Sequence, residues 1–238
     1  MNAKVLLLPG DGIGPEVTAQ AEKLINAVAA IHGLDIEISE ALIGGAALDD
    51  SGEPLPKATL KACREADAIV LGAVGGPKWD DPDARKRPEQ GLLELRKELG
   101  LFANLRPIRL HPALAEISPL KTERIQNVDM MVVRELTGGS YFGKKKQTDD
   151  NASDEYSYSR EEIERVVRMA ADMARARYGR VTMIDKANVL ATSRLWRKVS
   201  AEVMNKSYPD VAYETMLVDA AAMHIVANPS RFNVIVTE

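Results

Sequence analysis

The feature that most constrains the fold of this chain is an alternation of short apolar runs with amphipathic stretches. The apolar runs predict buried strands at 4–8, 67–75, 128–136, 180–185 and 232–238. Segments in which apolar residues recur every three or four positions predict helices at 14–33, 91–100, 159–179, 192–207 and 218–229. Strands that alternate with helices are typical of proteins built on a largely parallel sheet. The sequence therefore predicts an α/β fold.

Two of the predicted helices carry clear end signals. The first has Pro15 at its start and Gly33 at its stop, and the helix at 159–179 begins with a capping box of Ser159 and Glu162. The apolar residues of the first helix fall on one face: Val17, Ala21, Leu24, Ile25, Val28 and Ile31. Those of the later helix form a stripe: Ile163, Val166, Val167, Ala170 and Met173. A polar, proline-containing stretch at 75–89 predicts a long loop.

Composition excludes several classes of protein. The chain has 238 residues, 45% of them hydrophobic, which is enough for a sizeable core. Its net charge is −4 with both signs interspersed, so we do not expect a nucleic-acid partner. The single cysteine, Cys63, rules out an internal disulfide framework, and its helical surroundings favour a small core residue. No leader pattern begins the chain and no apolar run approaches the ~20 residues of a membrane span, so we expect a cytoplasmic protein without membrane contact.

The chain ends at Glu238, directly after its last apolar run. The α/β pattern leads us to expect a further helix at that point, which would cover the sheet. We therefore expect the fold to be incomplete at its C-terminus.

A glycine-rich stretch, "LLLPGDGIGPE" at 6–16, follows the first predicted strand. Gly10 and Gly12 match the first two glycines of a dinucleotide fingerprint, but Pro15 occupies the third position that the fingerprint reserves for glycine. The Gly-Lys-Ser/Thr ending of a phosphate-binding P-loop is also missing. These residues favour a tight turn between strand and helix, in which glycine permits positive φ.

Arginines are the first candidate binding residues. Arg96 lies four residues after Leu92 and seven after Glu89, and on a helix this spacing places Leu92 and Arg96 on one face. Arg106 precedes a proline, which disfavours helix at Arg106, and Arg134 ends a predicted strand. Guanidinium groups match carboxylates through paired hydrogen bonds, so three converging arginines would suit a dicarboxylate. Surface ion pairs are the alternative for each of them.

Further polar candidates follow predicted strands. Tyr141 lies in the glycine turn "GGSYFG", where an aromatic turn residue is the alternative interpretation. Lys186 and Asn188 follow the strand at 180–185, and the alternative for Lys186 is a solvated turn lysine. Asp219 stands at the start of a predicted helix, where an N-cap is the alternative.

Three segments resemble the β-decarboxylating dehydrogenases, the isocitrate/isopropylmalate dehydrogenase family. They are "LLPGDGIGPEV", "GLLELRKELGLFANLRP" and "VRELTGGSYFG", and the resemblance covers essentially the whole chain. It implies a two-domain fold with a mixed sheet that is not a Rossmann fold. Residues 1–100 would form the N-terminal part of a split cofactor-side domain, and 101–238 the substrate and dimerisation domain, without its C-terminal end.

The resemblance also implies an activity. It predicts an NAD-dependent oxidoreductase that oxidises and decarboxylates isopropylmalate to 2-oxoisocaproate in leucine biosynthesis. Leucines in "GLLELR" favour an alkyl-bearing substrate, because isocitrate dehydrogenases place a serine and an asparagine there. A tartrate- or isocitrate-type dehydrogenase is the near alternative. A non-catalytic chain that binds a dicarboxylate or only dimerises is the distant one.

Site roles are carried over residue by residue. Residues expected to bind substrate are Glu89, Leu92, Arg96, Arg106, Arg134 and Asp219. Lys186 would accept the hydroxyl proton, and Tyr141 would protonate the enol that decarboxylation leaves. Residues expected to contact the cofactor are Gly75, Gly76, Pro77, Lys78, Trp79, Glu89 and Asn188.

The family pattern also predicts a homodimer and a metal. Lys186 and Asp219 would enter the active site of the neighbouring subunit, and Asp219 would bind Mg²⁺ or Mn²⁺, which prefer oxygen ligands. Because lysine is protonated at neutral pH, its role as a base requires nearby positive charge or desolvation. Family members continue with two further metal-binding aspartates. We therefore expect the chain as given to be inactive.

Overall fold

The chain divides into two compact units, Met1–Gly100 (unit 1) and Leu101–Glu238 (unit 2). The computed structural model describes residues 2–81 and 83–238. Each unit has its own sheet and its own hydrophobic core. Within the described residues, no helix combines the length and the apolar character needed to cross a membrane.

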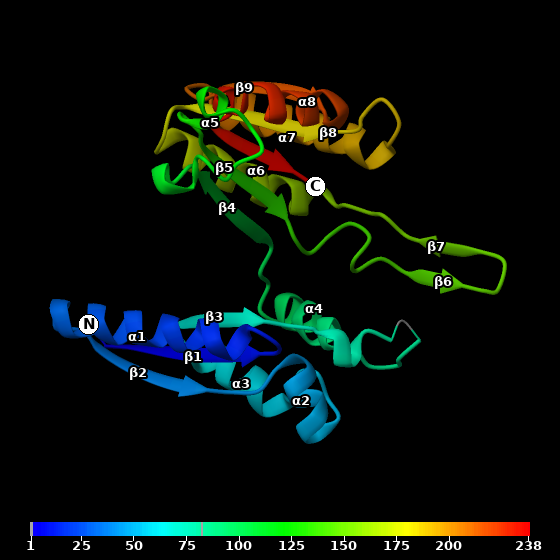
Figure 1. The fold of residues 1–238 in the computed structure, drawn as a ribbon. Helices are drawn as coiled ribbons and strands as arrows, with labels where there is room; N and C mark the ends of the chain where they lie inside the picture. The colour runs from blue at the N-terminus through cyan, green and yellow to red at the C-terminus, as the bar shows by residue number, and fades with distance from the viewer. Residues whose placement is uncertain (1, 82) are drawn as a thin grey trace. The chain divides into compact units, whose positions relative to one another are not determined.

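Unit 1 is a three-stranded parallel sheet with helices around it (Figure 1). Its elements in chain order are β1 (Asn2–Gly10), α1 (Gly14–His32), β2 (Asp35–Glu40), α2 (Gly44–Ser51), α3 (Lys57–Glu65), β3 (Ala68–Ala73), the 3₁₀ turn η1 (Pro77–Trp79) and α4 (Pro88–Glu98). The strand order is β2-β1-β3, so β1 is central and its apolar run is buried. Leu6 and Leu8 pack with Cys63 of α3 and Leu95 of α4. Cys63 is thus a core residue, as predicted, and burial raises the pKa of its thiol.

The glycine-rich stretch forms a tight turn between β1 and α1. Gly10 and Gly12 have φ of +70° and +57°, as the glycine pattern predicts. At Gly14 a Cβ would lie 2.0 Å from the carbonyl oxygen of Pro9, so the start of α1 approaches the strand very closely. The turn therefore needs glycine for backbone geometry.

The apolar face predicted for α1 is wrong in part. The helix contacts the sheet through a stripe of mostly small residues, of which Gly14 and Thr18 are buried and Ala21 and Ile25 half-buried. The large side chains beside this stripe are 38–76% exposed: Val17, Leu24, Val28 and Ile31. A helix can approach a sheet closely only through small residues. The large apolar side chains of α1 therefore do not lie at its contact with the sheet.

Helix α4 begins three residues earlier than the sequence pattern predicts. Pro88 occupies the first turn, where its fixed φ suits a helix and its missing N–H costs nothing. The backbone N–H of Arg87 donates to the side chain of Gln90 at 3.0 Å, which closes the helix start. Glu89 is consequently a helical residue and not part of the preceding loop.

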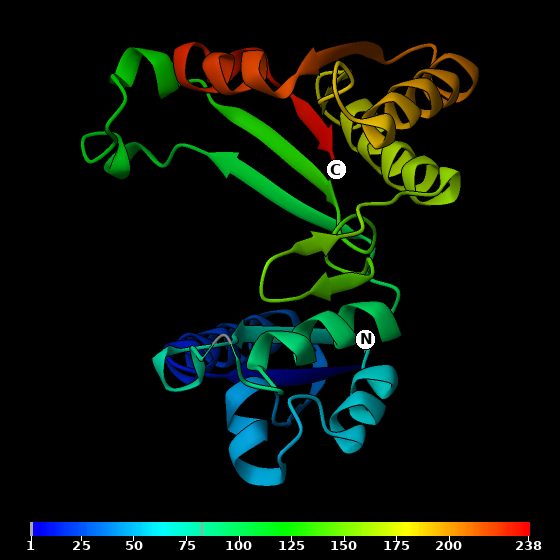
Figure 2. The ribbon, with the colours of Figure 1, turned by 90° about the vertical axis from the view of Figure 1, so that its right-hand side faces the viewer.

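Unit 2 is a five-stranded mixed sheet of order β4-β5-β10-β8-β9, with β4 antiparallel and the other strands parallel. Its elements are β4 (Ala103–Arg109), the 3₁₀ turn η2 (Pro112–Leu114), α5 (Thr122–Ile125), β5 (Asp129–Glu135), β6 (Lys145–Gln147), β7 (Ala152–Asp154), α6 (Arg160–Arg175), β8 (Arg180–Asp185), α7 (Ala191–Ser207), β9 (Ala212–Leu217), α8 (Val218–Ala227), the 3₁₀ turn η3 (Pro229–Arg231) and β10 (Val234–Thr237). Helices α6 and α7 pack side by side over one face (Figures 1 and 2). Hairpin β6–β7 projects from the sheet in both views.

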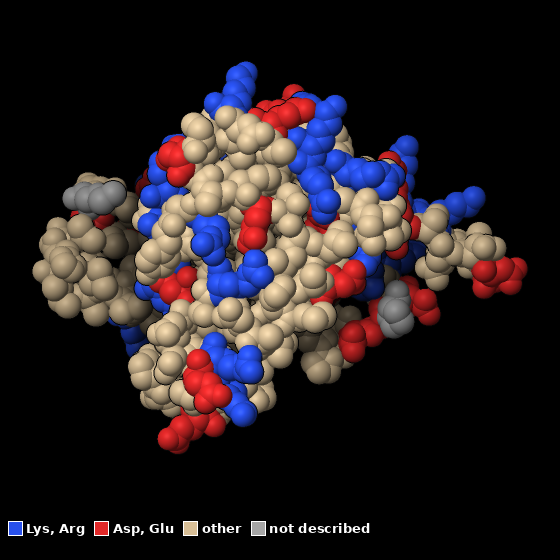
Figure 3. All heavy atoms as spheres, turned by 90° about the horizontal axis from the view of Figure 1, so that it is seen from above, with Lys and Arg blue, Asp and Glu red and all other residues tan. Residues whose placement is uncertain are grey.

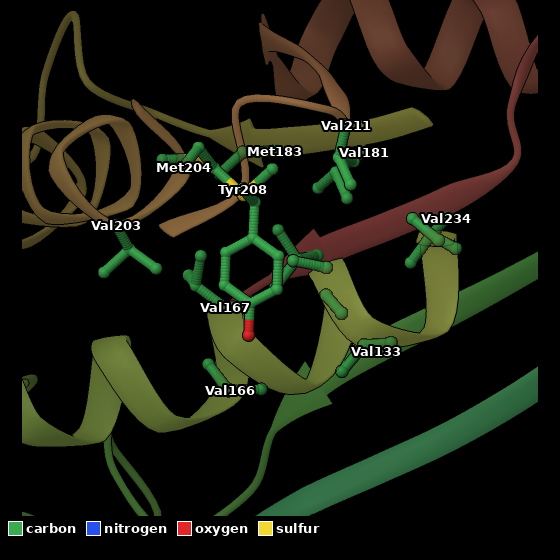
Figure 4. Packing of buried hydrophobic residues seen from close by; sticks show 14 of the residues in the cluster. Val133, Val166, Val167, Val181, Met183, Val203, Met204, Tyr208, Val211 and Val234 are labelled. Atoms are coloured by element: carbon green, nitrogen blue, oxygen red, sulfur yellow. The ribbon is translucent and has the colours of Figure 1, made fainter. Parts of the chain in front are cut away.

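The two faces of this sheet have separate cores because strand residues alternate between them. Val133, Met183 and Val234 pack against α6 and α7, where Tyr208 lies among the labelled side chains of Figure 4. Met130 and Ile235 face the opposite way, toward α8. The mixed α/β architecture agrees with the fold predicted from the sequence.

The capping box predicted for α6 is present. Ser159 Oγ accepts the N–H of Glu162 at 3.2 Å, and the Glu162 carboxylate accepts the N–H of Ser159 at 2.7 Å. The predicted stripe is also buried: Ile163, Val166, Val167 and Ala170 have no exposed surface, and Met173 is half-buried. On the face drawn in Figure 3, acidic and basic side chains are interspersed and no single-sign patch dominates.

Candidate active site

The C-terminal edge of the unit 2 sheet collects several candidate residues. Strands β5, β10 and β8 run parallel, and their register aligns Arg134 with Thr237 and Thr237 with Ile184. Segments leaving this edge carry Tyr141 after β5 and Lys186 after β8. Ligands commonly bind beyond the carboxyl ends of parallel strands, because the connecting loops diverge there.

Two of the predicted arginines share one face of the sheet. Arg134 of β5 pairs with Asn104 of β4, and Arg106 pairs with Val132, so Arg106 and Arg134 are diagonal neighbours. The alternation of β5 places them on the face that carries α8. Arg106 is exposed, and its Nε donates to the Asn104 side chain at 2.6 Å. This arrangement can present two guanidinium groups to one anionic ligand.

Tyr141 lies against the second of these arginines. The guanidinium carbon of Arg134 is 5.3 Å from the centre of the Tyr141 ring, a cation–π contact. Tyr141 as a residue is 49% exposed. The sequence placed these two residues seven positions apart, and the glycine turn between them brings them together.

Lys186 and Asp219 form an ion pair between Nζ and Oδ2. Lys186 directly follows β8, its backbone N–H donates to Ser193 Oγ at 3.2 Å, and its side chain is 30% exposed. The N-cap interpretation of Asp219 is wrong. Helix α8 begins at Val218 with Leu217 in the cap position, so Asp219 lies inside the first turn and extends toward Lys186.

A complete metal site is not formed by the described residues. Among them, no three or more His, Cys, Asp and Glu side chains lie close enough together to hold a metal ion. Asp219 offers one carboxylate, and that carboxylate already contacts Lys186. Because Mg²⁺ prefers six oxygen ligands, including its waters, the residues described here do not suffice for it.

The predicted cofactor residues lie in unit 1, apart from Asn188. A cavity of about 390 Å³ is lined by Gly76, Pro77, Trp79, Asp80, Asp81, Arg87 and Glu89. Lys78 pairs with Asp49 of α2 at 2.5 Å and lies 5.1 Å from the centre of the Trp79 ring. Gly75 has φ of +101°, and a Cβ there would lie 2.6 Å from the Glu89 carboxylate. Gly75 therefore lies directly against Glu89 in the first turn of α4.

Helix α4 carries three candidate residues, of which only Leu92 and Arg96 were predicted to be helical. Glu89, Leu92 and Arg96 are spaced at i, i+3 and i+7, and all three belong to the helix. Leu92 and Arg96 are half-buried and Glu89 is exposed. Arg96 is thus in unit 1, whereas Arg106 and Arg134 are in unit 2. Asn188 is an exposed residue of unit 2 on a basic cavity of about 600 Å³, with Arg194, Arg197 and Lys198.

Asp11 is a residue that the sequence analysis missed. Its buried carboxylate accepts the backbone N–H groups of Gly45 at 2.8 Å, Ala46 at 2.7 Å and Gly75 at 2.8 Å. It therefore joins the glycine turn, the start of α2 and the loop after β3. The motif "GDG" contained this residue, but nothing local indicated partners 34 to 64 positions away.

Comparison with known proteins gives a consistent result. The family model described as isocitrate/isopropylmalate dehydrogenase matches residues 4–238. A 3-isopropylmalate dehydrogenase from Rhodopirellula baltica is 54% identical over all of this chain and 67% of its own length. One from Anaeromyxobacter dehalogenans is 53% identical over all of this chain and 69% of its own length.

Solved structures agree with these relatives. An isocitrate dehydrogenase from Methylococcus capsulatus matches 99% of this chain and 66% of its own, with 33% identity and a TM-score of 0.82. A β-decarboxylating dehydrogenase from Thermococcus kodakarensis matches 99% and 64%, with 32% identity and a TM-score of 0.74. The chain thus spans about two thirds of the length of these four proteins. These matches confirm the resemblance found in the glycine turn and the arginine segments: the chain belongs to the isocitrate/isopropylmalate dehydrogenase family of oxidoreductases.

Proposed function

We propose that the protein carrying this chain oxidises and decarboxylates (2R,3S)-3-isopropylmalate to 2-oxoisocaproate with reduction of NAD, a step of leucine biosynthesis. The observation that carries this proposal is 54% identity, over the whole chain, to a protein named 3-isopropylmalate dehydrogenase. Leu92 on the Arg96 face of α4 supports it, because an apolar side chain suits an alkyl substituent better than a third carboxylate.

The chain's own residues have the chemistry that this reaction needs. Arg96, Arg106 and Arg134 bind the two carboxylates of the substrate, and their positive charge favours the dianion. Glu89 and Leu92 of α4 line the pocket for the isopropyl group. Unit 1 is the cofactor-side unit, and Gly75, Gly76, Pro77, Lys78 and Trp79, together with Asn188 of unit 2, contact the cofactor. NAD, when bound, supplies the hydride acceptor.

Proton transfers fall to Lys186 and Tyr141. For this role Lys186 must first lose the proton that it carries in the ion pair with Asp219. As the C2–H bond transfers its hydride, Nζ then accepts the proton of the C2 hydroxyl group, which leaves a 2-oxo acid. The bond between C3 and its carboxylate then breaks, carbon dioxide leaves, and the electron pair forms the C2=C3 double bond of an enolate. The Tyr141 hydroxyl gives its proton to C3, which restores the 2-oxo group and completes 2-oxoisocaproate.

Two partners belong to the same proposal. Asp219 contributes one carboxylate to a Mg²⁺ or Mn²⁺ site, whose other ligands lie outside the residues described here, and it also contacts the substrate. The protein is a homodimer in which Lys186 and Asp219 serve the neighbouring subunit's site. Support comes from α8, which contains Asp219 in its first turn and exposes Met223 and Val226 at 72% and 56%.

The test is NADH formation, followed by absorbance, from the complete protein that carries this chain. Isopropylmalate, isocitrate and tartrate are supplied in parallel with NAD and Mn²⁺, and turnover with isopropylmalate alone is expected. Preferred turnover of isocitrate or tartrate would contradict the substrate assignment. The 238-residue chain, assayed beside it, is expected to be silent.

A further inference from the structure

A buried carboxylate lies directly behind the turn that carries Tyr141. Glu135 is the last residue of β5, and its side chain has no exposed surface. Its Oε2 accepts the backbone N–H groups of Thr137 at 2.9 Å and Gly138 at 2.6 Å. Its Oε1 accepts the Thr137 hydroxyl and a guanidinium N–H of Arg165, each at 2.9 Å. Four donors therefore converge on one side chain.

This convergence requires a carboxylate. An ionised glutamate accepts at both oxygens, whereas the amide of glutamine replaces one acceptor by an NH₂ donor. In either amide orientation, that NH₂ would face donors that now bind the carboxylate. A buried N–H left without an acceptor loses its hydration and gains nothing in return. The four donors around position 135 therefore favour glutamate over glutamine.

The turn held by Glu135 is also packed from its other side. Gly138 lies against the Tyr158 ring, where a Cβ would be 2.5 Å from a ring carbon. Gly139 has φ of +71°, and its N–H donates to the carbonyl oxygen of Ser157 at 2.8 Å. Tyr158 in turn packs edge-on against the buried Trp196, with 5.3 Å between ring centres. These contacts and the Glu135 hydrogen bonds together hold the turn in the conformation described.

Alternation along β5 gives its last two residues different directions. Glu135 points toward α6, where Arg165 meets it, and Arg134 points to the opposite face. Tyr141 returns to Arg134 after the turn. The segment from Arg134 to Tyr141 thus folds back on itself. The Glu135 carboxylate holds the backbone of the turn, and the cation–π contact holds Tyr141 against Arg134.

We propose that Glu135 is a positioning residue, whose carboxylate fixes the turn at 137–139 and so holds the Tyr141 ring on the Arg134 guanidinium. The inference rests on the proposed function only for the chemical role of Tyr141. Its structural part, the placement of the ring, can be tested without turnover.

The first test measures the surroundings of Tyr141 directly. The complete protein is labelled with 3-fluorotyrosine, and the ¹⁹F signal of Tyr141 is assigned by its loss in Tyr141→Phe. In Glu135→Gln we expect this signal to move most of the way toward that of free fluorotyrosine. A signal that keeps its position would overturn the proposal.

The matched control lies at the other end of the same strand. Asp129 is the first residue of β5, and its carboxylate pairs with Arg177, much as the Glu135 carboxylate pairs with Arg165. Asp129→Asn should leave the Tyr141 signal unchanged, and an equal shift in this variant would overturn the proposal. If Glu135→Gln does not fold, Thr137→Val removes a single hydroxyl, and a smaller shift in the same direction is expected. An unmoved signal in Thr137→Val would then count against the proposal.

The second test is kinetic. In unlabelled Glu135→Gln, kcat should fall by about 10²-fold, because small displacements of a reacting group have effects of that order. KM for isopropylmalate should change less than kcat. Unchanged kcat despite a shifted ¹⁹F signal would overturn the catalytic part of the proposal. If the wild-type protein shows no turnover at all, the proposed function fails, and the ¹⁹F result still decides the role of Glu135.

Discussion

The ammonium group of Lys186 and the carboxylate of Asp219 are paired across 33 positions of sequence. The cause lies in the neighbouring parallel strands β8 and β9, whose register aligns Asp185 with Leu217. The next residues of the two strands therefore leave the sheet side by side. This pairing places a proton-transfer candidate and a metal-ligand candidate in contact without any other group between them.

Replacing Lys186 by methionine should reduce kcat by about 10²–10⁴-fold, because it removes the group that accepts the hydroxyl proton. Stability should change by less than about 1 kcal/mol, since partly exposed ion pairs contribute little. Initial rates of NADH formation and a urea titration measure the two effects. Lys206→Met, at the exposed end of α7, is the matched control and should retain wild-type rates. A loss of less than tenfold in Lys186→Met would argue against its role as the base.

Substrate preference should depend on Leu92. We expect Leu92→Ser to lower kcat/KM for isopropylmalate by about 10–200-fold, the usual range for losing apolar contact with an alkyl group. Leu60→Ser is the control, because Leu60 is also a half-buried leucine of unit 1 and belongs to a different helix, α3. Equal losses in the two variants, measured with isopropylmalate at saturating NAD, would remove the case for a Leu92 pocket.

Asp11→Asn should destabilise unit 1 by about 1–3 kcal/mol, because an amide cannot accept from all three backbone N–H groups that Asp11 holds. The chain has two tryptophans, Trp79 in unit 1 and Trp196 in unit 2. In a Trp196→Phe background, Trp79 fluorescence during urea unfolding therefore reports on unit 1 alone. Asp67→Asn removes an exposed carboxylate that accepts one backbone N–H, from Lys4, and should have a smaller effect. Indistinguishable midpoints would contradict this account of Asp11.

Acid should remove the stabilising contribution of Asp129. Hydrogen bonds from Arg109 and Arg177 hold the pKa of this carboxyl below its usual value. A depressed pKa in the folded state stabilises the protein above the unfolded pKa of about 3.9, and the contribution is lost as pH falls through the folded value. The free energy of unfolding of wild type should thus exceed that of Asp129→Asn at pH 7, and the difference should shrink toward pH 3. Urea titrations at both pH values measure it, and a difference that does not change with pH would refute the linkage.

Long elements with strong periodicity could be predicted from the sequence. The apolar runs of β1, β5, β8 and β10 and the stripe of α6 are buried on the faces that their spacing indicates. Strand β2 and hairpin β6–β7 escaped prediction because many of their residues are polar and exposed. Strand β9 escaped because polar residues interrupt its apolar ones, so it has no continuous apolar run. The buried face of α1 was predicted wrongly for another reason. The helix contacts the sheet through Gly14 and Thr18 and not through its large apolar residues.

Some residues of the candidate site could likewise be predicted from the sequence, and others could not. Segments with a family resemblance supplied Arg134, Tyr141 and Lys186 by their motifs. Asp11 and Glu135 have no such local indication, because their importance lies in which backbone N–H groups meet them after folding. The N-cap interpretation of Asp219 failed because α8 already begins at Val218, and the Asp219 carboxylate pairs with Lys186 instead. Pattern analysis finds side chains with a typical spacing and misses those defined by distant backbone groups.

Strand β10 has a consequence for the order in which unit 2 assembles on the ribosome. It lies between β5 and β8, yet it follows both of them in the chain. Until Val234–Thr237 emerges, β4–β5 and β8–β9 are separate ribbons with open hydrogen-bonding edges and an unfilled gap between them. Such edges pair readily with other chains. Nascent unit 2 is therefore exposed to aggregation at these edges until β10 is synthesised, and closure of the gap depends on contacts between residues far apart in the chain, which form slowly.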